Sequence, residues 1–222
     1  KLGQLDAAVE CYEKAIAIKP GYTEAHNNLG NALKDLGQLD AAIEYYKKAL
    51  SFKPDYAEAH NNLGIAFKQL GQLDAAIKSY ERLLALKPDD AETHNNLGIV
   101  YMQLNQTDVA LKCYKKALAL KPDYADAHAN RGNVMKRLKH MDEALASYKS
   151  AIALDPELVF ILGDIYVTKM RLCIWDGLEI HLKELTKKVN NGEKALNPFI
   201  ALALIDDPEI QRKAAEIYAN KE

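Results

Sequence analysis

Apolar residues recur through most of the chain at the spacing of amphipathic helices. Leu29, Leu33 and Leu36 fall on one face of a helix within residues 23–56, and a second apolar set follows them. Gly37 lies between the two sets, where a left-handed turn residue is wanted, and Pro54 ends the second set. The pattern predicts two helices that pack as an antiparallel hairpin. The second set comprises Leu39, Ala42, Ile43, Tyr46, Ala49 and Leu50.

This hairpin is one copy of a repeated unit. The sequence AHNNLG at 59–64 returns almost unchanged at 25–30 and 93–98 and in degraded form at 127–132, always at an interval of 34 residues. A unit repeated in this way stacks on its neighbours. We therefore predict an all-α solenoid, a right-handed superhelix of helical hairpins. Its divisions are a partial unit (second helix only) at 1–22, repeats at 23–56, 57–90, 91–124 and 125–158, and a helical adaptor at 159–222. Prolines keep the same interval, at Pro20, Pro54, Pro88, Pro122 and Pro156.

The unit resembles the tetratricopeptide repeat in its pattern of small and large residues. In the copy at 23–56 these residues are Leu29, Gly30, Ala42, Tyr46, Ala49 and Pro54. The resemblance implies stacked helical hairpins that bind other polypeptides. The chain departs from the family by having histidine where the family often has tryptophan, at His26, His60, His94 and His128.

The first and last units depart from the common pattern. Residues 2–8 correspond to 36–42, so we expect a turn followed by a second helix, and a partner helix upstream of this fragment. The turn residue changes from Gly37 and Gly71 to Asn105 and then Lys139. A non-glycine residue held in the left-handed region costs about 1 to 2 kcal/mol. We expect the last repeat to have the least stable turn.

The last part of the chain also has helical patterns. Apolar spacing predicts helices over 158–173 and 175–189, and Asp207-Pro208 is typical of the start of a helix that ends near Ala219. Residues 162–218 resemble the segment that joins the repeats to the catalytic region in O-linked N-acetylglucosamine transferases, especially bacterial ones. This resemblance implies that the chain is the polypeptide-recruiting arm of such an enzyme, without its catalytic region.

The charge, cysteine spacing and apolar runs of the chain limit the kinds of partner that we expect it to bind and the compartment in which we expect it. A net charge of −2, with lysines alternating with acids, leaves no basic stripe and argues against nucleic acid or an anionic membrane as a partner. The cysteines Cys11, Cys113 and Cys173 have no CxxC spacing, which suits reduced thiols in a cytoplasmic protein. The longest apolar run, 199–205, is far shorter than the roughly 20 residues that cross a bilayer.

No group of residues predicts catalysis or cofactor binding by this chain alone. The four histidines at the 34-residue interval lie one per repeat, and packed helices are separated by roughly 8 to 10 Å. Zinc needs ligands at about 2.0 to 2.1 Å, so we expect these histidines to pack structurally and to bind no metal. Three acids could be imagined as part of a catalytic acid pair, but they are more simply explained as polar positions of helices: Asp164, Asp176 and Glu179. The sequence contains no phosphate loop, nucleotide motif or catalytic triad.

Asparagines recur at one point of each predicted first helix, although asparagine is a mediocre helix former. In stacked repeats the first helices line the concave side, so the amides would offer donors and acceptors to an extended polypeptide. This column resembles the asparagine ladder of the same transferases, which binds polypeptides. The alternative is that the amides bond neighbouring repeats and stiffen the stack. The candidate peptide-binding residues are Asn27, Asn28, Asn31, Asn61, Asn62, Asn95, Asn96 and Asn130.

Two other functions compete with the transferase arm. One is a free-standing scaffold that assembles several proteins and belongs to no enzyme. The other is a clamp for the carboxylate tails of chaperones, which needs basic first helices. Lys34, Lys68, Lys136 and Arg137 supply some positive charge there, but an acid stands two residues before each repeated histidine and would repel such a tail. These acids are Glu24, Glu58, Glu92 and Asp126.

The run at 199–205 is apolar on every side, so the adaptor cannot bury all of it in one direction. We expect part of it to be an interface, either with the catalytic region that the resemblance implies or with a second copy of the chain. The alternative is a fully buried strut inside the adaptor.

Overall fold

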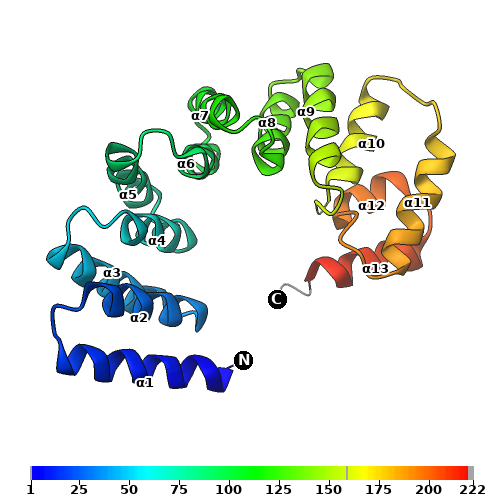
Figure 1. Ribbon diagram of the computed structural model, residues 1–222. Coiled ribbons are helices and arrows are strands. Elements are labelled where there is room, and N and C mark those ends of the chain that lie inside the picture. The colour runs from blue at the N-terminus through cyan, green and yellow to red at the C-terminus, as the bar shows by residue number, and fades with distance from the viewer. Residues whose placement is uncertain (1, 159, 220–222) are drawn as a thin grey trace. The chain divides into compact units, whose positions relative to one another are not determined.

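The computed structural model describes residues 2–158 and 160–219, and in this part of the chain it contains thirteen α-helices and no strand (Figure 1). The protein is an all-α solenoid, as the sequence predicts. It divides into two compact units, residues 1–113 and 114–222, whose boundary lies inside α7. The two units are described separately.

In the first unit, the helices from α1 to α6 form a series in which each packs on the next helix along the chain. α1 packs on α2, the hairpins α2–α3 and α4–α5 follow, and α2 also contacts α4. The first helices α2, α4 and α6 begin at 23, 57 and 91, the first residues of three predicted repeats. The helices are α1 (Leu2–Ile18), α2 (Thr23–Asp35), α3 (Leu39–Phe52), α4 (Ala57–Gln69), α5 (Leu73–Leu86), α6 (Ala91–Gln103) and α7 (Thr107–Leu120).

The second unit contains the last hairpin and the C-terminal helices. α8 pairs with α9, α9 packs on α10, and α12 contacts both α10 and α13, while α11 packs on α10 and α13. Residues 159 and 220–222 of the predicted adaptor lie outside the described residues. The helices are α8 (Ala125–Arg137), α9 (Met141–Leu154), α10 (Ile161–Arg171), α11 (Leu178–Asn190), α12 (Pro198–Leu204) and α13 (Pro208–Ala219).

The turns inside the hairpins have the left-handed backbone that the sequence predicts. Gly37 and Gly71 have φ angles of 77° and 74°, and Asn105 and Lys139 have φ angles of 61° and 64°. All four turns therefore share one geometry, and the two later repeats hold a non-glycine residue in a region that costs about 1 to 2 kcal/mol.

The predicted turn at the start of the chain is wrong, because α1 runs as a helix from Leu2 through Gly3. In the corresponding turn, Gly37 donates its N–H to the carbonyl of Lys34, and Gln38 donates to the carbonyl of Leu33. Gly3 lies inside α1 and forms no such turn.

Two C-terminal helices begin later than the sequence predicts. α10 starts at Ile161 because Phe160 is left-handed, with φ of 65°, and donates its N–H to the carbonyl of Lys194. α11 starts at Leu178 because Gly177 is left-handed, with φ of 73°. In both cases the apolar pattern begins before the helix does, because a left-handed residue of the adaptor prevents the helix from starting earlier.

The start of α13 agrees with the prediction. The side chain of Asp207 accepts hydrogen bonds from the backbone N–H groups of Glu209 and Ile210, at 2.9 and 3.3 Å. Pro208 is the first helical residue, where its missing N–H costs nothing.

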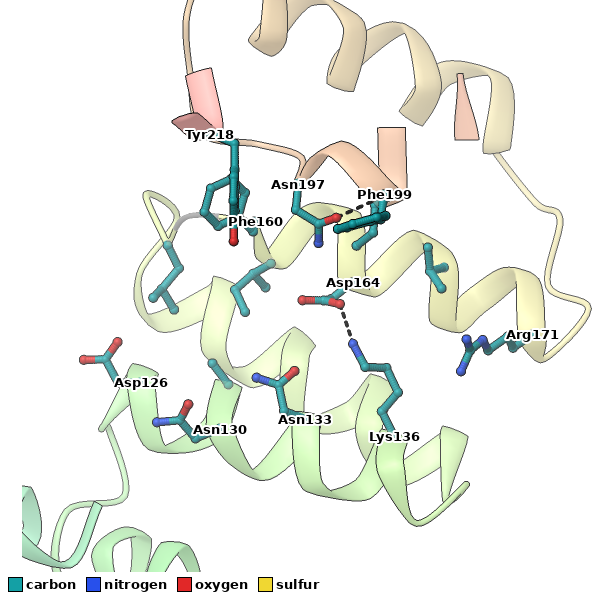
Figure 2. A pocket seen from close by; sticks show the side chains of 15 residues that line it. Asp126, Asn130, Asn133, Lys136, Phe160, Asp164, Arg171, Asn197, Phe199 and Tyr218 are labelled. Atoms are coloured by element: carbon teal, nitrogen blue, oxygen red, sulfur yellow. Dashed lines mark hydrogen bonds and ion pairs between the residues drawn. The ribbon is translucent and has the colours of Figure 1, made fainter. Parts of the chain in front are cut away.

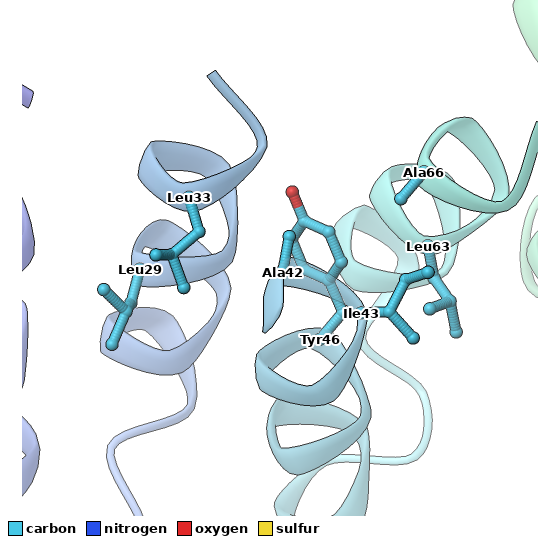
Figure 3. Packing of buried hydrophobic residues seen from close by; sticks show 7 residues of the cluster. All are labelled: Leu29, Leu33, Ala42, Ile43, Tyr46, Leu63 and Ala66. Carbon is cyan, nitrogen blue, oxygen red and sulfur yellow. The ribbon is translucent and has the colours of Figure 1, made fainter. Parts of the chain in front are cut away.

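The cores of three hairpins contain a tyrosine ring that lies directly on a glycine. Figure 3 shows Tyr46 of α3 among Leu29 and Leu33 of α2, with Leu63 of α4 on the other side. A Cβ added at Gly30 would lie 2.5 Å from Tyr46 Cε1. The same contact occurs between Gly64 and Tyr80, at 2.6 Å, and between Gly132 and Tyr148, at 2.5 Å. The two helices therefore approach to a distance that only glycine permits.

The tyrosine hydroxyls are satisfied in some repeats and not in others. Tyr46 donates to Asn31 Oδ1 at 2.8 Å, and Tyr148 donates to Asn133 Oδ1 at 2.8 Å. The equivalent position for Tyr80 is Ile65, and the buried hydroxyl of Tyr80 has no hydrogen-bond partner among the described residues. A buried unpaired hydroxyl is destabilising.

This difference gives a matched pair of variants. Tyr46→Phe should lower the free energy of unfolding by about 0.5 to 1.5 kcal/mol, because it removes a hydrogen bond to Asn31. Tyr80→Phe should leave the free energy unchanged or raise it by up to about 1 kcal/mol, because no partner is lost. Urea denaturation of both variants checks this, and an equal loss of stability in the two would contradict it.

Candidate functional site

The four repeated histidines hold the loops that lead into the first helices. Each ring lies with Nε2 at hydrogen-bond distance from the carbonyl of the proline six residues earlier, and a carbonyl can only accept, so Nε2 is the donor. The distances are 2.7 Å for His26 and Pro20, 2.9 Å for His60 and Pro54, 3.1 Å for His94 and Pro88, and 2.8 Å for His128 and Pro122. The predicted structural role therefore has a specific contact, which is the same in all four repeats.

Two of the predicted asparagines join neighbouring repeats. Asn62 on α4 donates its amide to Asn27 Oδ1 on α2 at 3.0 Å, and Asn27 in turn donates to Glu58 Oε1 at 2.8 Å. Asn27 is fully buried, and Asn62 is 8% exposed. Tyr56 donates its hydroxyl to Glu58 Oε2 at 3.2 Å, which holds the carboxylate in place. These four side chains form a link between α2 and α4, as the structural alternative for the amides expects.

The link is not repeated between α4 and α6. Asn61 and Asn96 occupy the corresponding positions, yet both are half-buried and neither amide bonds to another described residue. The tyrosine of the first link is replaced at position 90 by aspartate, so no hydroxyl holds Glu92. Asp90 instead caps α6, accepting from the N–H of Glu92 and the hydroxyl of Thr93. The later repeats thus differ from the first link at both Asp90 and Thr93, and the amides of Asn61 and Asn96 have no partner among the described residues.

The remaining candidate asparagines fall into separate environments. Asn28 is half-buried, and its amide also has no bond to a described residue. Asn31 accepts the hydroxyl of Tyr46, as described above. Asn95 is buried, and Asn130 is half-buried; both interact with other residues. The predicted column is therefore not uniform, and Asn28, Asn61 and Asn96 are its members with free amides.

The lysines on the first helices differ in their ion-pair partners and in their burial. Lys34 lies 3.6 Å from Asp35, and Lys136 donates to Asp164 at 2.6 Å. Burial lowers the pKa of Lys68. Glu58, which was expected to repel an acidic tail, is engaged with Asn27 and Tyr56. Sequence reasoning missed this role of Glu58, although the recurrence of tyrosine two residues before the acid was a signal for it.

The histidines, cysteines and acids considered above for metal binding or catalysis are not gathered into one site among the described residues. In the described part of the chain, no cluster of three or more His, Cys, Asp or Glu side chains could hold a metal ion. The cysteines are free thiols, and burial raises the pKa of Cys113. Asp164 is paired with Lys136, whereas Asp176 and Glu179 are exposed.

Two protein-family models of helical repeats match the chain, in agreement with the helical hairpins described above. A model described as TPR repeat matches residues 1–37, 30–71, 66–105 and 100–139, and a model described as tetratricopeptide repeat matches residues 125–158. The chain belongs to the tetratricopeptide repeat family. No match was found among the curated proteins. None of the described helices of this tetratricopeptide repeat protein is long and apolar enough to cross a bilayer.

Solved structures with the same fold include other repeat proteins. The crystal structure of MamA is 30% identical, covers 70% of this chain and 91% of that chain, and has a TM-score of 0.65. A MamA from Desulfovibrio magneticus RS-1 is 20% identical over 73% of this chain and 92% of that chain, with a TM-score of 0.65. YrrB, a TPR protein with an unusual peptide-binding site, is 21% identical over 94% of this chain and 99% of that chain, with a TM-score of 0.63.

The two kinds of asparagine should differ in their effect on stability. Asn27→Ala should lower the free energy of unfolding by about 1 to 3 kcal/mol, because it leaves Glu58 and Asn62 without their partner in a buried link. Asn61→Ala, the equivalent change one repeat later, should stay within about 0.5 kcal/mol of the parent. Thermal and urea midpoints of the two variants measure this. Equal destabilisation would show that Asn61 also holds repeats together.

Proposed function

We propose that this chain is a polypeptide-binding scaffold and that its ligands lie extended along the faces of the first helices. The observation that carries the proposal is the set of half-buried amides at Asn28, Asn61 and Asn96, which have unused donors and acceptors. Polar groups that are partly removed from water normally have hydrogen-bond partners. An extended backbone presents a donor and an acceptor at every residue, which is what an amide complements.

The comparisons support a binding role of this class. YrrB is a repeat protein of the same fold with a peptide-binding site. One acid of the first helices is also compatible with it, because the carboxylate of Glu58 is engaged by Asn27 and Tyr56. We assign the binding role to the amides at Asn28, Asn61 and Asn96, and a mainly structural role to Asn27, Asn62 and Asn31.

The test separates binding from folding. A peptide selected from a random display library on the parent chain is titrated against Asn61→Ala/Asn96→Ala and against Asn27→Ala/Asn62→Ala. At about 0.5 to 1.5 kcal/mol for each hydrogen bond, the first pair should weaken binding by about 1 to 3 kcal/mol and leave the thermal midpoint unchanged. The second pair should lower the midpoint and, below it, bind with little loss. Equal affinity of the parent and the Asn61→Ala/Asn96→Ala variant would contradict the proposal.

A more specific form of this function is the recruiting arm of an O-linked N-acetylglucosamine transferase-like protein. It rests on the resemblance of residues 162–218, a segment beyond the last family match, which ends at 158. Phe199 and Leu202 on α12 are 83% and 62% exposed, as expected for a surface that another region covers.

The coding sequence decides between this arm and a free-standing scaffold. A reading frame that continues past Glu222 into a glycosyltransferase region supports the arm. A stop codon directly after Glu222 would leave the scaffold without a linked enzyme and would contradict the arm.

A further inference from the structure

The second unit contains a cleft that the repeat pattern does not predict. Its volume is about 710 Å³, within the range of roughly 300 to 1,000 Å³ that ligand pockets occupy. Figure 2 shows that α8 forms one wall, while α10, α12 and α13 contribute the rest. The cleft is therefore formed between the last repeat and the adaptor, and none of the earlier repeats has these adaptor helices.

Aromatic rings line the side of the cleft that faces α8 (Figure 2). The rings of Phe160 and Tyr218 lie 5.6 Å apart, and both line the cleft. Phe160 is held in the left-handed region, an unfavourable conformation for an aromatic residue and one that clusters at functional sites. Phe199 on α12 also lines the cleft, with 83% of its side chain exposed. These three rings leave apolar surface facing the cavity.

The floor of the cleft has an amide of fixed orientation. Because Asn133 Oδ1 accepts the hydroxyl of Tyr148 at 2.8 Å, its Nδ2 is the free end of the amide. Asn133 is exposed and lines the cleft, so Nδ2 is available as a donor there. A backbone carbonyl of an extended peptide is the matching acceptor.

Four charged side chains line the cleft, and the two without an ion pair lie at its opposite ends. Lys136 and Asp164 neutralise each other across it, at 2.6 Å. Asp126 lies at the start of α8 and Arg171 at the end of α10, and neither forms an ion pair with a described residue (Figure 2). The wall that α8 forms is about 15 Å long between Asp126 and Lys136, which are ten residues apart. An extended peptide covers that distance with about five residues.

We propose that this cleft binds a short extended peptide in which a large apolar side chain lies between a basic residue and an acidic residue. The apolar side chain would pack against Phe160, Phe199 and Tyr218, the basic residue would lie at Asp126, and the acidic residue at Arg171. The inference rests on the proposed function in its general class, but it uses residues of the second unit alone.

The probe is a fluorescein-labelled hexapeptide with arginine first, phenylalanine third, glutamate last and alanine elsewhere, titrated into the full chain by fluorescence anisotropy. We expect saturable binding. Phe199→Ser should weaken it at least about tenfold, because a buried aromatic contact is lost. Leu202→Ser is the matched control, since Leu202 is an exposed residue of the same helix that does not line the cleft, and it should bind like the parent.

A charge exchange tests the end of the cleft at Arg171. Arg171→Glu should weaken binding about fivefold, as loss and reversal of an exposed ion pair would do. A hexapeptide with lysine in the last position should bind the parent weakly and recover its affinity on Arg171→Glu. The absence of saturable binding, equal effects of Phe199→Ser and Leu202→Ser, or no exchange of preference would overturn the inference.

The variant Asn61→Ala/Asn96→Ala separates this inference from the proposed function. Binding of the hexapeptide that survives this change, but not Phe199→Ser, supports the cleft. Binding that is lost with Asn61→Ala/Asn96→Ala and unaffected by Phe199→Ser would overturn the cleft and leave the first-helix face as the binding surface.

Discussion

The close contact between a tyrosine ring and a glycine is the constraint on which the hairpins α2–α3, α4–α5 and α8–α9 depend. Gly30, Gly64 and Gly132 have no Cβ, and the facing ring fills the space that one would occupy. Because the ring fixes both the distance and the rotation of the first helix, it also fixes which residues of that helix point away from the hairpin. The asparagines two and three residues before Gly30 owe their positions near the next repeat to this contact.

A shared backbone does not give the repeats the same hydrogen bonds. Tyr46 has a partner at Asn31, whereas the corresponding position for Tyr80 is an isoleucine. Asn27 belongs to a link that needs the hydroxyl of Tyr56, and the next repeat has Asp90 in that place. The repeat pattern therefore sets where a side chain lies, and its neighbours decide whether it holds the fold together or remains available to a ligand.

Much of the fold could be predicted from the sequence because it follows from local rules. Left-handed turns were expected at Gly37 and Lys139 from their place in the repeat, and both have that backbone. The cap at Asp207 follows in the same way from the proline after it. Each of these features depends on a few neighbouring residues.

The features that could not be predicted depend on contacts between distant residues. The late start of α10 depends on a hydrogen bond from Phe160 to Lys194, and the state of Asn61 depends on what stands at position 90. Gly3 matches Gly37 in sequence, yet it lies inside α1 and forms no turn. A periodic pattern assigns the same role to equivalent residues, and it misses cases where the partner has changed or is missing.

The adaptor uses the glycine contact of the repeats in a different way. Leu162-Gly163 repeats the leucine-glycine pair of the first helices, but arrives three residues early against the 34-residue interval. A Cβ at Gly163 would lie 2.8 Å from Leu196 Cδ2 and 3.1 Å from Ile200 Cγ2, not against a tyrosine ring. α10 is therefore placed like another first helix, packed on α9, while Leu196 and α12 take the place of a second helix. Because α12 is short and carries Phe199 outward, this exchange ends the repeat series and opens the cleft beside α8.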